Sequence, residues 1–369
     1  MMNVPEYILI IASSGRMLAQ AAKNAGLKAL VIDLFADLDT QEYAIDFYRI
    51  LSLSEQHLAS AVDYFVNRYA VSHIIYGSGF EYYPESLNYL NNRLTLLGNS
   101  ADTFVKLHDK PQFFSQLDAL NIAYPEVAYN APQGADDWLV KPMYGQGGAG
   151  IKRYQINNTS GSAVYWQKYQ TGTQHSVLFL ANGQVMQVLG FNRQWTAGLA
   201  ETEEFIFSGI TNNSELLNEH QLLVTDWLTK IIPVFELKGL NSLDFIQSGD
   251  NSYLLEINPR PSASMQLYDA DLIIRHIRAC QGELSDYNFV QDSTSAYQIV
   301  YADQDMLIPE AFLWPDWCMD LPEPGSLIHT GQPICSIIAR HLVAEPVSYC
   351  QQMAATLIQL ILENQILKT

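Results

Sequence analysis

The sequence has little positive charge, few cysteines and no long apolar run. Its 369 residues include 20 Lys and Arg against 39 Asp and Glu, a formal net charge of -19 at pH 7. This charge opposes a phosphate backbone, so we expect no nucleic-acid partner. The four cysteines lie far apart without a C-x-x-C, which indicates neither a zinc site nor a disulfide framework. The apolar stretch at 7–12 is too short for a membrane span or a signal peptide, so we expect a cytoplasmic protein with no membrane partner.

The composition is that of a globular protein, with 48% hydrophobic and 16% charged residues, and the length suggests two or three domains. The first hundred residues alternate between strand and helix patterns. Such alternation predicts a parallel sheet covered on both faces. The strand patterns occupy 6–12, 28–34 and 72–79, and the helix patterns occupy 15–26 and 55–70.

A glycine-rich loop follows a strand pattern in "LVKPMYGQGGAGIKRY", residues 139–154. Gly145, Gly147 and Gly150 form a literal G-x-G-x-x-G, with Lys141 upstream. A dinucleotide fingerprint needs a helix to begin at the glycines, but "IKRYQI" alternates with the period of a strand. A Walker loop needs its lysine after the glycines. We interpret the segment as a hairpin whose backbone N–H groups can approach a triphosphate, and a hairpin without a ligand is the alternative.

A second hairpin pattern occupies residues 239–261, where "SGDN" joins two strand-like runs. If the turn centres near residue 250, Asp244 lies opposite Glu256, and Asn258 projects from the same face. Two facing carboxylates repel each other unless a cation lies between them. Three oxygen ligands on one face of a sheet suit magnesium, which takes its other ligands from phosphates and water.

These two hairpins, with "HDKPQFF" before them and "YWQKYQTGTQHSVLFL" between them, occur in the order and rough spacing of the ATP-grasp superfamily. The resemblance covers about residues 100–282, and "IIYGSGFE" and "LLGN" before it resemble the preceding domain of carboxylate–amine ligases. The nucleotide-binding residues that the resemblance implies are Lys110 and Lys141 on the phosphates, Gly145, Gly147, Gly148 and Gly150 in a mobile flap, Gln167, Lys168 and Tyr169 in a hinge at the adenine, and Gln174 at the ribose. It implies Asp244, Glu256 and Asn258 as metal ligands and Arg260 with Lys141 as catalytic residues.

The resemblance also implies a fold and a reaction. The fold is α/β, with a Rossmann-like parallel sheet at 1–99, an ATP-grasp fold of two α+β subdomains at 100–282, and a β-rich appendage with a terminal helix at 283–369. The reaction joins a carboxylate to an amine through an acyl phosphate. The implied cofactors are ATP and two Mg²⁺ ions, with Mn²⁺ as a substitute, and the implied partners are small-molecule substrates and a second copy in a homodimer.

The substrates are less well defined by the sequence. The motif set is most similar to the small ligases of methanopterin- and methanofuran-type C1-cofactor biosynthesis, including tyrosine- or tyramine-glutamate ligases. We expect Glu81, Tyr82 and Arg193 near the substrates, Glu81 as an acceptor for an ammonium group. Arg260 or Arg193 would replace the arginine that some members carry where this chain has Ser242.

Two other functional classes stay open at this point. An NAD-dependent oxidoreductase is favoured by the literal G-x-G-x-x-G and by the Rossmann-like start, and opposed by the strand pattern after Gly150. A non-catalytic nucleotide sensor would keep the fold, although sensing does not require a full set of metal ligands. Gln167 and Gln174 stand where many ATP-grasp members have glutamates, which makes the hinge and ribose contacts the weakest of the expected ones.

Overall fold

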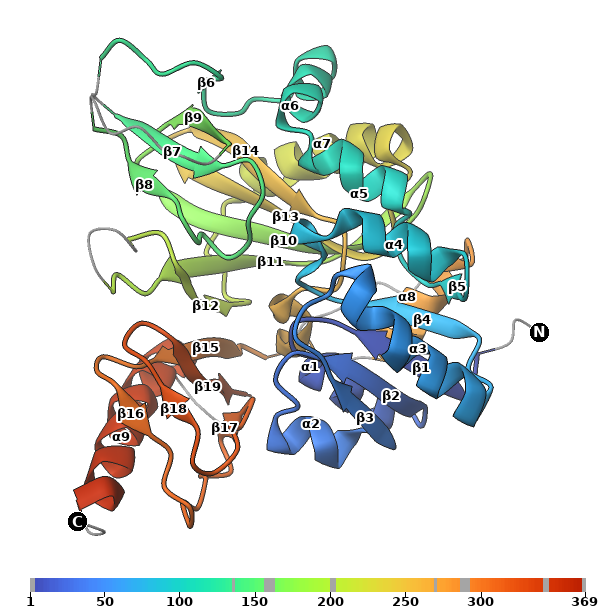
Figure 1. Cartoon of the computed structure of the whole chain (residues 1–369). Helices are drawn as coiled ribbons and strands as arrows, with labels where there is room; N and C mark the ends of the chain where they lie inside the picture. Colours follow the sequence, from blue (N-terminus) through green and yellow to red (C-terminus); the bar gives the residue numbers. More distant parts are fainter. Residues whose placement is uncertain are drawn as a thin grey trace.

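The computed structural model describes residues 4–134, 137–155, 163–199, 204–268, 271–285, 293–340 and 345–366 (Figure 1). None of the helices in these ranges is both long and apolar enough to cross a membrane.

The N-terminal part is a five-stranded parallel sheet in the order β3-β2-β1-β4-β5, as the alternating pattern predicts. Its central strands are almost completely buried, because helices and the rest of the chain cover both faces. The strands are β1 (Tyr7–Ile11), β2 (Lys28–Asp33), β3 (Asp46–Arg49), β4 (His73–Tyr76) and β5 (Thr95–Leu96). The helices are α1 (Arg16–Asn24), α2 (Leu38–Tyr43), α3 (Glu55–Tyr69) and α4 (Pro84–Asn91), with the short turn η1 (Phe80–Tyr82) after β4.

Two helices and a small sheet follow. The helices α5 (Ala101–His108) and α6 (Lys110–Ala119) are separated at Asp109, whose side chain accepts a hydrogen bond from the Gln112 N–H at 3.0 Å and so begins the second helix. The antiparallel sheet has the order β6-β9-β7-β8. Its strands are β6 (Val127–Ala128), β7 (Trp138–Pro142), β8 (Lys152–Arg153) and β9 (Val164–Lys168).

The largest element is an eight-stranded sheet in the order β14-β13-β10-β11-β12-β15-β19-β17. Its first strands cross the centre of the molecule (Figure 1). One core cluster lies between this sheet and the helix α7 (Asn218–Phe235), and α8 (Leu272–Cys280) packs against β10 and β13. The strands are β10 (Thr173–Asn182), β11 (Met186–Thr196), β12 (Phe207–Thr211), β13 (Lys238–Ser248) and β14 (Asn251–Asn258), and the turn η3 (Ala263–Leu267) follows them.

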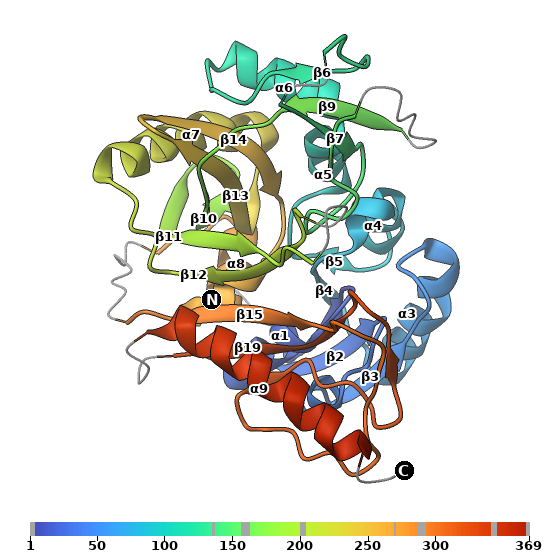
Figure 2. The same ribbon diagram turned by 90° about the vertical axis from the view of Figure 1, so that its left-hand side faces the viewer.

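The C-terminal strands continue the same sheet. β15 pairs with β12, and β19 and β17 follow it at the edge. The helix α9 (Pro346–Ile366) lies along β15 and β19 (Figure 2). The C-terminal segment is therefore joined to the central part by backbone hydrogen bonds. Its strands are β15 (Ala296–Tyr301), β16 (Met306–Leu307), β17 (Cys318–Met319), β18 (Leu327–Ile328) and β19 (Pro333–Ala339).

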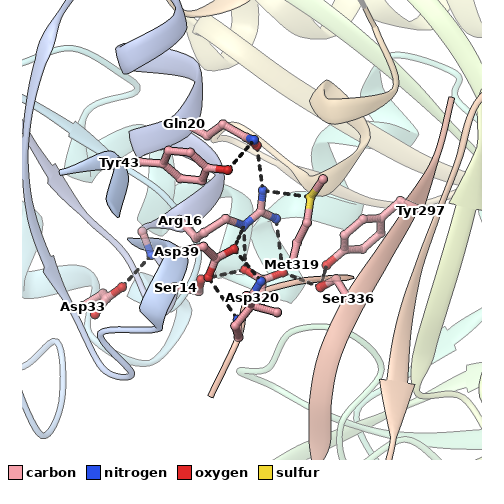
Figure 3. Close-up of polar contacts among 12 residues, drawn as sticks. Ser14, Arg16, Gln20, Asp33, Asp39, Tyr43, Tyr297, Met319, Asp320 and Ser336 are labelled. Carbon is pink, nitrogen blue, oxygen red and sulfur yellow. Dashed lines mark hydrogen bonds and ion pairs between the residues drawn. The ribbon is translucent and has the colours of Figure 1, made fainter. Parts of the chain in front are cut away.

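A buried arginine connects the N-terminal part to these last strands (Figure 3). The Arg16 guanidinium is 1% exposed and binds Asp320 with Nε to Oδ1 at 2.9 Å and Nη2 to Oδ2 at 3.1 Å. Asp39 accepts the backbone N–H groups of Asp320 and Leu321 at 2.9 and 3.0 Å. The Ser336 hydroxyl also binds Asp320. This charge-assisted network holds the residues that follow β17 against α1 and α2.

Candidate functional site

A cleft of about 290 Å³ lies between the small sheet and the first strands of the large sheet. The structure brings most of the expected residues to its walls. Those that line the cleft are Lys110, Lys141, Gly145, Gly147, Gly148, Gln167, Lys168, Tyr169, Gln174, Asp244, Glu256, Asn258 and Arg260. The expected residues outside its lining are Gly150, Glu81, Tyr82 and Arg193.

The carboxylate hairpin has the predicted pairs at the cleft, although the pairs nearest the turn, such as Ser248 with Asn251, follow a different register. Asp244 on β13 pairs with Glu256 on β14, and Ser242 pairs with Asn258. A bulge after Asp244 shifts the pairing so that Phe245 faces Leu254, and Leu255 joins the cleft lining. All these strand residues come from two adjacent strands of one sheet. The carboxylates face each other on the cleft side because the bulge moves Asp244 into register with Glu256.

Asp244 is held by two amides. The Gln194 Nε2 donates to its Oδ1 and the Asn258 Nδ2 to its Oδ2, both at 3.0 Å. Burial and the neighbouring Glu256 carboxylate nevertheless raise the pKa of Asp244 to about 7, from an ordinary value of 3.8. Without a cation, the pair thus avoids carrying two full charges. A divalent cation between the carboxylates would remove this repulsion, so the donor set fits magnesium.

The expected metal site would need ligands from outside the protein. Among the described residues, no group of three His, Cys, Asp or Glu side chains is arranged to hold a metal ion. A cation between Asp244 and Glu256 would therefore need the amide oxygen of Asn258 and further oxygens from water or phosphate. This is the usual situation of magnesium at a nucleotide site, where few ligands come from the protein.

Two lysines line the cleft with the carboxylates. The Lys141 Nζ on β7 donates to the Gln167 Oε1 at 3.0 Å. Burial lowers the pKa of Lys141, while Glu256 and Asp244 counteract this shift. Lys110 lies at the start of α6. The cleft thus carries cationic groups suited to anionic oxygens beside a pair of carboxylates suited to a cation.

The glycine loop is a hairpin between β7 and β8, with Leu139 opposite Arg153. A strand and not a helix follows the glycines, so the loop lacks the helix N-terminus that an NAD site needs. The loop touches the start of β12, where the Gly147 carbonyl accepts the Phe207 N–H at 2.9 Å. Gly148 has a φ of +80°, and a Cβ there would overlap the Phe205 carbonyl. Gly150 packs on Pro142 at the base of the loop.

The hinge between β9 and β10 is more restricted than the resemblance implies. The N–H of Lys168 donates to the Glu126 carbonyl at 2.8 Å, and the N–H of Tyr169 donates to the Asp137 carbonyl at 2.6 Å. In this arrangement a purine gains no hydrogen bond from these two N–H groups. Gln167 is 2% exposed, and its Nε2 has no hydrogen-bond partner although the residue lines the cleft. Since a buried donor without a partner is costly, this amide is suited to an acceptor on a ligand.

The expected substrate residues are placed differently. Arg193 lies within β11, and its Nη1 binds Glu215 at 2.8 Å at the surface. Its neighbour Gln194 faces the cleft. Tyr82 lies beside the flap, where a Cβ on Gly145 would be 3.9 Å from the tyrosine hydroxyl oxygen.

Glu81 is not free to receive an ammonium group. Its Oε1 accepts the Arg260 Nε at 2.7 Å, and its Oε2 accepts the Gly79 N–H at 2.7 Å. Burial acts to raise the pKa of Glu81, but Arg260 and the hydrogen bonds outweigh it, and the net shift is downward.

Two further residues line the cleft, and sequence reasoning does not consider Gln194 and interprets His108, beside Lys110, as a helix-surface residue. Gln194 contacts Asp244. In the sequence, only the alternation within β11 indicates that Gln194, and not its neighbour Arg193, points into the cleft. His108 lines the cleft beside Lys110, with its ring stacked on Phe104 at 4.4 Å and its Nδ1 bound to the Phe104 carbonyl at 2.8 Å. Burial lowers the pKa of His108, and Lys110 adds to the effect. The sequence signal for this stacked pair is a histidine four residues after an aromatic residue on a helix.

Comparison with known proteins agrees with this geometry. Residues 107–264 match the family model described as "ATP-grasp domain". An uncharacterized protein of Methanocaldococcus jannaschii is 21% identical over 262 residues, which are 66% of this chain and 64% of that protein. Residues 107–264 are thus similar to an ATP-grasp domain, and the chain spans less than two thirds of this relative.

Solved structures share the fold over nearly the whole chain. The L-amino acid ligase of Bacillus licheniformis has a TM-score of 0.74 at 12% identity, covering 96% of this chain and 98% of that one. The biotin carboxylase domain of the Hydrogenobacter thermophilus 2-oxoglutarate carboxylase, solved with MgADP and bicarbonate, has a TM-score of 0.71 at 14% identity, covering 90% and 85%. At these identities the likeness shows the fold, which is the expected parallel sheet followed by an ATP-grasp fold.

Proposed function

We propose that the chain uses its ATP-grasp domain to join a carboxylate to an amine at the expense of ATP. The observation that carries the proposal is the pair Asp244 and Glu256, which face each other in the cleft with a raised pKa on Asp244. A cleft that only binds an uncharged ligand gains nothing from such a pair. The pair is useful where a divalent cation and a triphosphate bind together.

The residues of the cleft would have different roles, according to the chemistry of their side chains. Asp244, Glu256 and Asn258 would hold magnesium, which offsets charge on the phosphates when bound. Lys110 and Lys141 would bind phosphate oxygens. The hairpin with Gly147 and Gly148 would exclude water from the reacting groups, and Arg260 would stabilise charge at the transferred phosphoryl group. The hinge and Gln174 would bind the nucleoside.

The proposed reaction needs no side-chain nucleophile. An oxygen of the substrate carboxylate attacks the γ-phosphorus of ATP, ADP leaves, and an acyl phosphate forms. The amine nitrogen then attacks the acyl carbon, phosphate leaves, and the nitrogen loses a proton. The chain supplies positioning and electrostatic stabilisation for both steps, which is the larger part of the catalysis of phosphoryl transfer.

We further propose amino acids as the substrates. The fold of the L-amino acid ligase supports this class, and the motif resemblance supports glutamate and tyrosine or tyramine as partners in C1-cofactor biosynthesis. Within the described cleft lining, Arg260 is the one arginine, so we assign the carboxylate contact to it and not to Arg193. A homodimer in the cytoplasm remains part of this proposal.

The experiment is a screen of amino-acid pairs for phosphate release with ATP and magnesium. We expect release that requires both a carboxylate and an amine, and an amide product detected by mass spectrometry. Glu256→Gln should abolish this release, whereas Glu215→Gln, at the surface, should match the wild type. Nicotinamide-dependent redox chemistry, or nucleotide binding without turnover of any pair, would contradict the proposal.

A further inference from the structure

The end of β14 is attached to the N-terminal part by three side chains. The Tyr76 hydroxyl on β4 donates to the Pro259 carbonyl at 3.0 Å, and the Asn99 Nδ2 donates to the same oxygen at 2.9 Å. Glu81 on η1 binds the next residue, Arg260. These side chains come from "IIYGSGFE" and "LLGN", motifs that the proposed nucleotide site does not otherwise use.

The ion pair is isolated from solvent. The side chains of Arg260 and Glu81 are 10% and 3% exposed, and their Nε and Oε1 atoms are 2.7 Å apart. The second carboxylate oxygen is fixed by the Gly79 N–H, in a turn where Gly79 has a φ of +107°. A residue with a side chain rarely adopts this φ, and a Cβ there would overlap the Ser13 hydroxyl. The turn therefore presents Glu81 in one orientation.

Arg260 in turn contacts the metal-binding strand. Its Nη2 donates to the Asn258 Oδ1 at 3.3 Å, and the Asn258 Nδ2 donates to Asp244 at 3.0 Å. A continuous set of hydrogen bonds thus runs from the N-terminal sheet through Arg260 to the carboxylates. Because an unsupported arginine has several rotatable bonds, the fixed Glu81 limits which part of the cleft the guanidinium can reach.

We propose that Glu81 is a positioning residue, which holds Arg260 toward the phosphoryl end of the cleft, with Tyr76 and Asn99 fixing the backbone beside it. The inference deepens the proposed function, since it rests on a nucleotide binding in this cleft. Glu81 acts through the arginine and takes no part in binding an ammonium substrate. The N-terminal sheet therefore helps to recognise the terminal phosphate although it does not line the cleft.

The test compares the binding of two nucleotides by calorimetry, so it does not require the amino-acid substrates. The ratio of the Kd of MgADP to that of magnesium β,γ-imido-ATP measures the contribution of the terminal phosphate. We expect Glu81→Gln to lower this ratio about tenfold, because the charge-assisted pair is lost, and to leave the Kd of MgADP within about twofold. Glu215→Gln, in the exposed pair with Arg193, is the matched control and should leave both values unchanged.

A double-mutant cycle separates positioning from general destabilisation. We expect Arg260→Ala to lower the ratio at least as far as Glu81→Gln, and the double variant to equal Arg260→Ala alone. If Glu81→Gln does not fold, Tyr76→Phe is measured instead, with a smaller fall in the same ratio. An unchanged ratio in Glu81→Gln, additive effects in the double variant, or equal loss of both nucleotides overturns the inference. Absence of binding of either nucleotide to the wild type contradicts the proposed function itself.

Discussion

Replacing Asp244 by asparagine should stabilise the metal-free protein, and should do so more at high pH than at low pH. The pKa of Asp244 is raised by burial and by Glu256 to about 7, so the folded state resists ionisation of this group. Between pH 4 and pH 7 the folded state binds more protons than the unfolded state. The wild type therefore loses stability as the pH rises through this window, and the loss is complete above pH 7.

The size of the effect follows from the shift. The pKa of Asp244 rises from 3.8 to about 7, and each pKa unit corresponds to about 1.36 kcal/mol. The raised pKa therefore lowers the free energy of unfolding of the wild type by at most about 4 kcal/mol at pH 8 and by about 2 kcal/mol at pH 5. The amide of the Asp244→Asn variant is always neutral and avoids this penalty, but it gives up one of the two hydrogen bonds from Gln194 and Asn258, a loss of about 1 kcal/mol. The advantage of the variant should therefore fall by about 2 kcal/mol between pH 8 and pH 5.

The assay is urea unfolding in EDTA at both pH values. Other raised carboxyl groups, such as Asp37, whose pKa burial and Asp320 raise to about 8, act equally in both proteins and cancel in the difference. Asp226→Asn, in an exposed pair with Lys230, is the control and should change stability by less than about 0.5 kcal/mol at either pH. A less stable Asp244→Asn at pH 8, or an advantage independent of pH, would refute the reasoning.

Three further predictions concern other parts of the molecule. Arg16→Met leaves Asp320 buried without its cation and should lower the free energy of unfolding by about 3–5 kcal/mol in urea, and a loss under about 1 kcal/mol would contradict the role given to this pair. Gly147→Ala and Gly148→Ala carry the same φ penalty, but only Gly148 lies against the Phe205 carbonyl. We therefore expect the release of imido-ATP, measured by stopped flow, to be about tenfold faster in Gly148→Ala but not in Gly147→Ala. Equal release rates in the two variants would contradict the proposed flap contact. Lys141→Ala should weaken MgATP binding at least about tenfold by calorimetry while the melting temperature stays or rises, because a buried cation is removed, and an unchanged affinity would exclude the phosphate contact.

The parts of the site that sequence reasoning predicts are those fixed by local rules. The turn "SGDN" locates the hairpin of β13 and β14 and pairs Ser248 with Asn251, a register that alone would place Asp244 opposite Leu255. The bulge after Asp244 moves it opposite Glu256, the pair that a turn centred near residue 250 predicts. The period of "IKRYQI" likewise identifies a hairpin and not a helix after the glycines. Both features depend on residues close together in the sequence.

The parts that it misses depend on distant pairing. Whether Arg193 or Gln194 faces the cleft is decided by the pairing of β11 with β10, which shifts at a bulge between Leu178 and Phe179. Gly190 adjoins this bulge, but a glycine inside a strand does not show which residue on the other strand each neighbour pairs with. The pair of Arg16 and Asp320 joins positions 304 residues apart, and β15 joins the large sheet through partners such as Gly209 and Gln298, 89 residues apart.

Glu81 shows a further limit of sequence reasoning. An acidic residue after a strand of an open sheet indicates a ligand contact, and this is how its role is first interpreted. The structure supplies a protein partner, Arg260, from 179 residues away. The sequence shows that Glu81 is a carboxylate that could bind a cationic ligand, but it does not show that Arg260 of the same chain already binds it.

The central claim, a magnesium-dependent nucleotide site at the carboxylate hairpin, is tested most directly by titrating imido-ATP into the protein with magnesium and with EDTA. We predict that the wild type binds one nucleotide at least about tenfold more tightly with magnesium, and that Glu256→Gln keeps the affinity measured in EDTA but loses this increase. Equal affinity with and without magnesium in the wild type, or an undiminished magnesium effect in Glu256→Gln, would contradict the account.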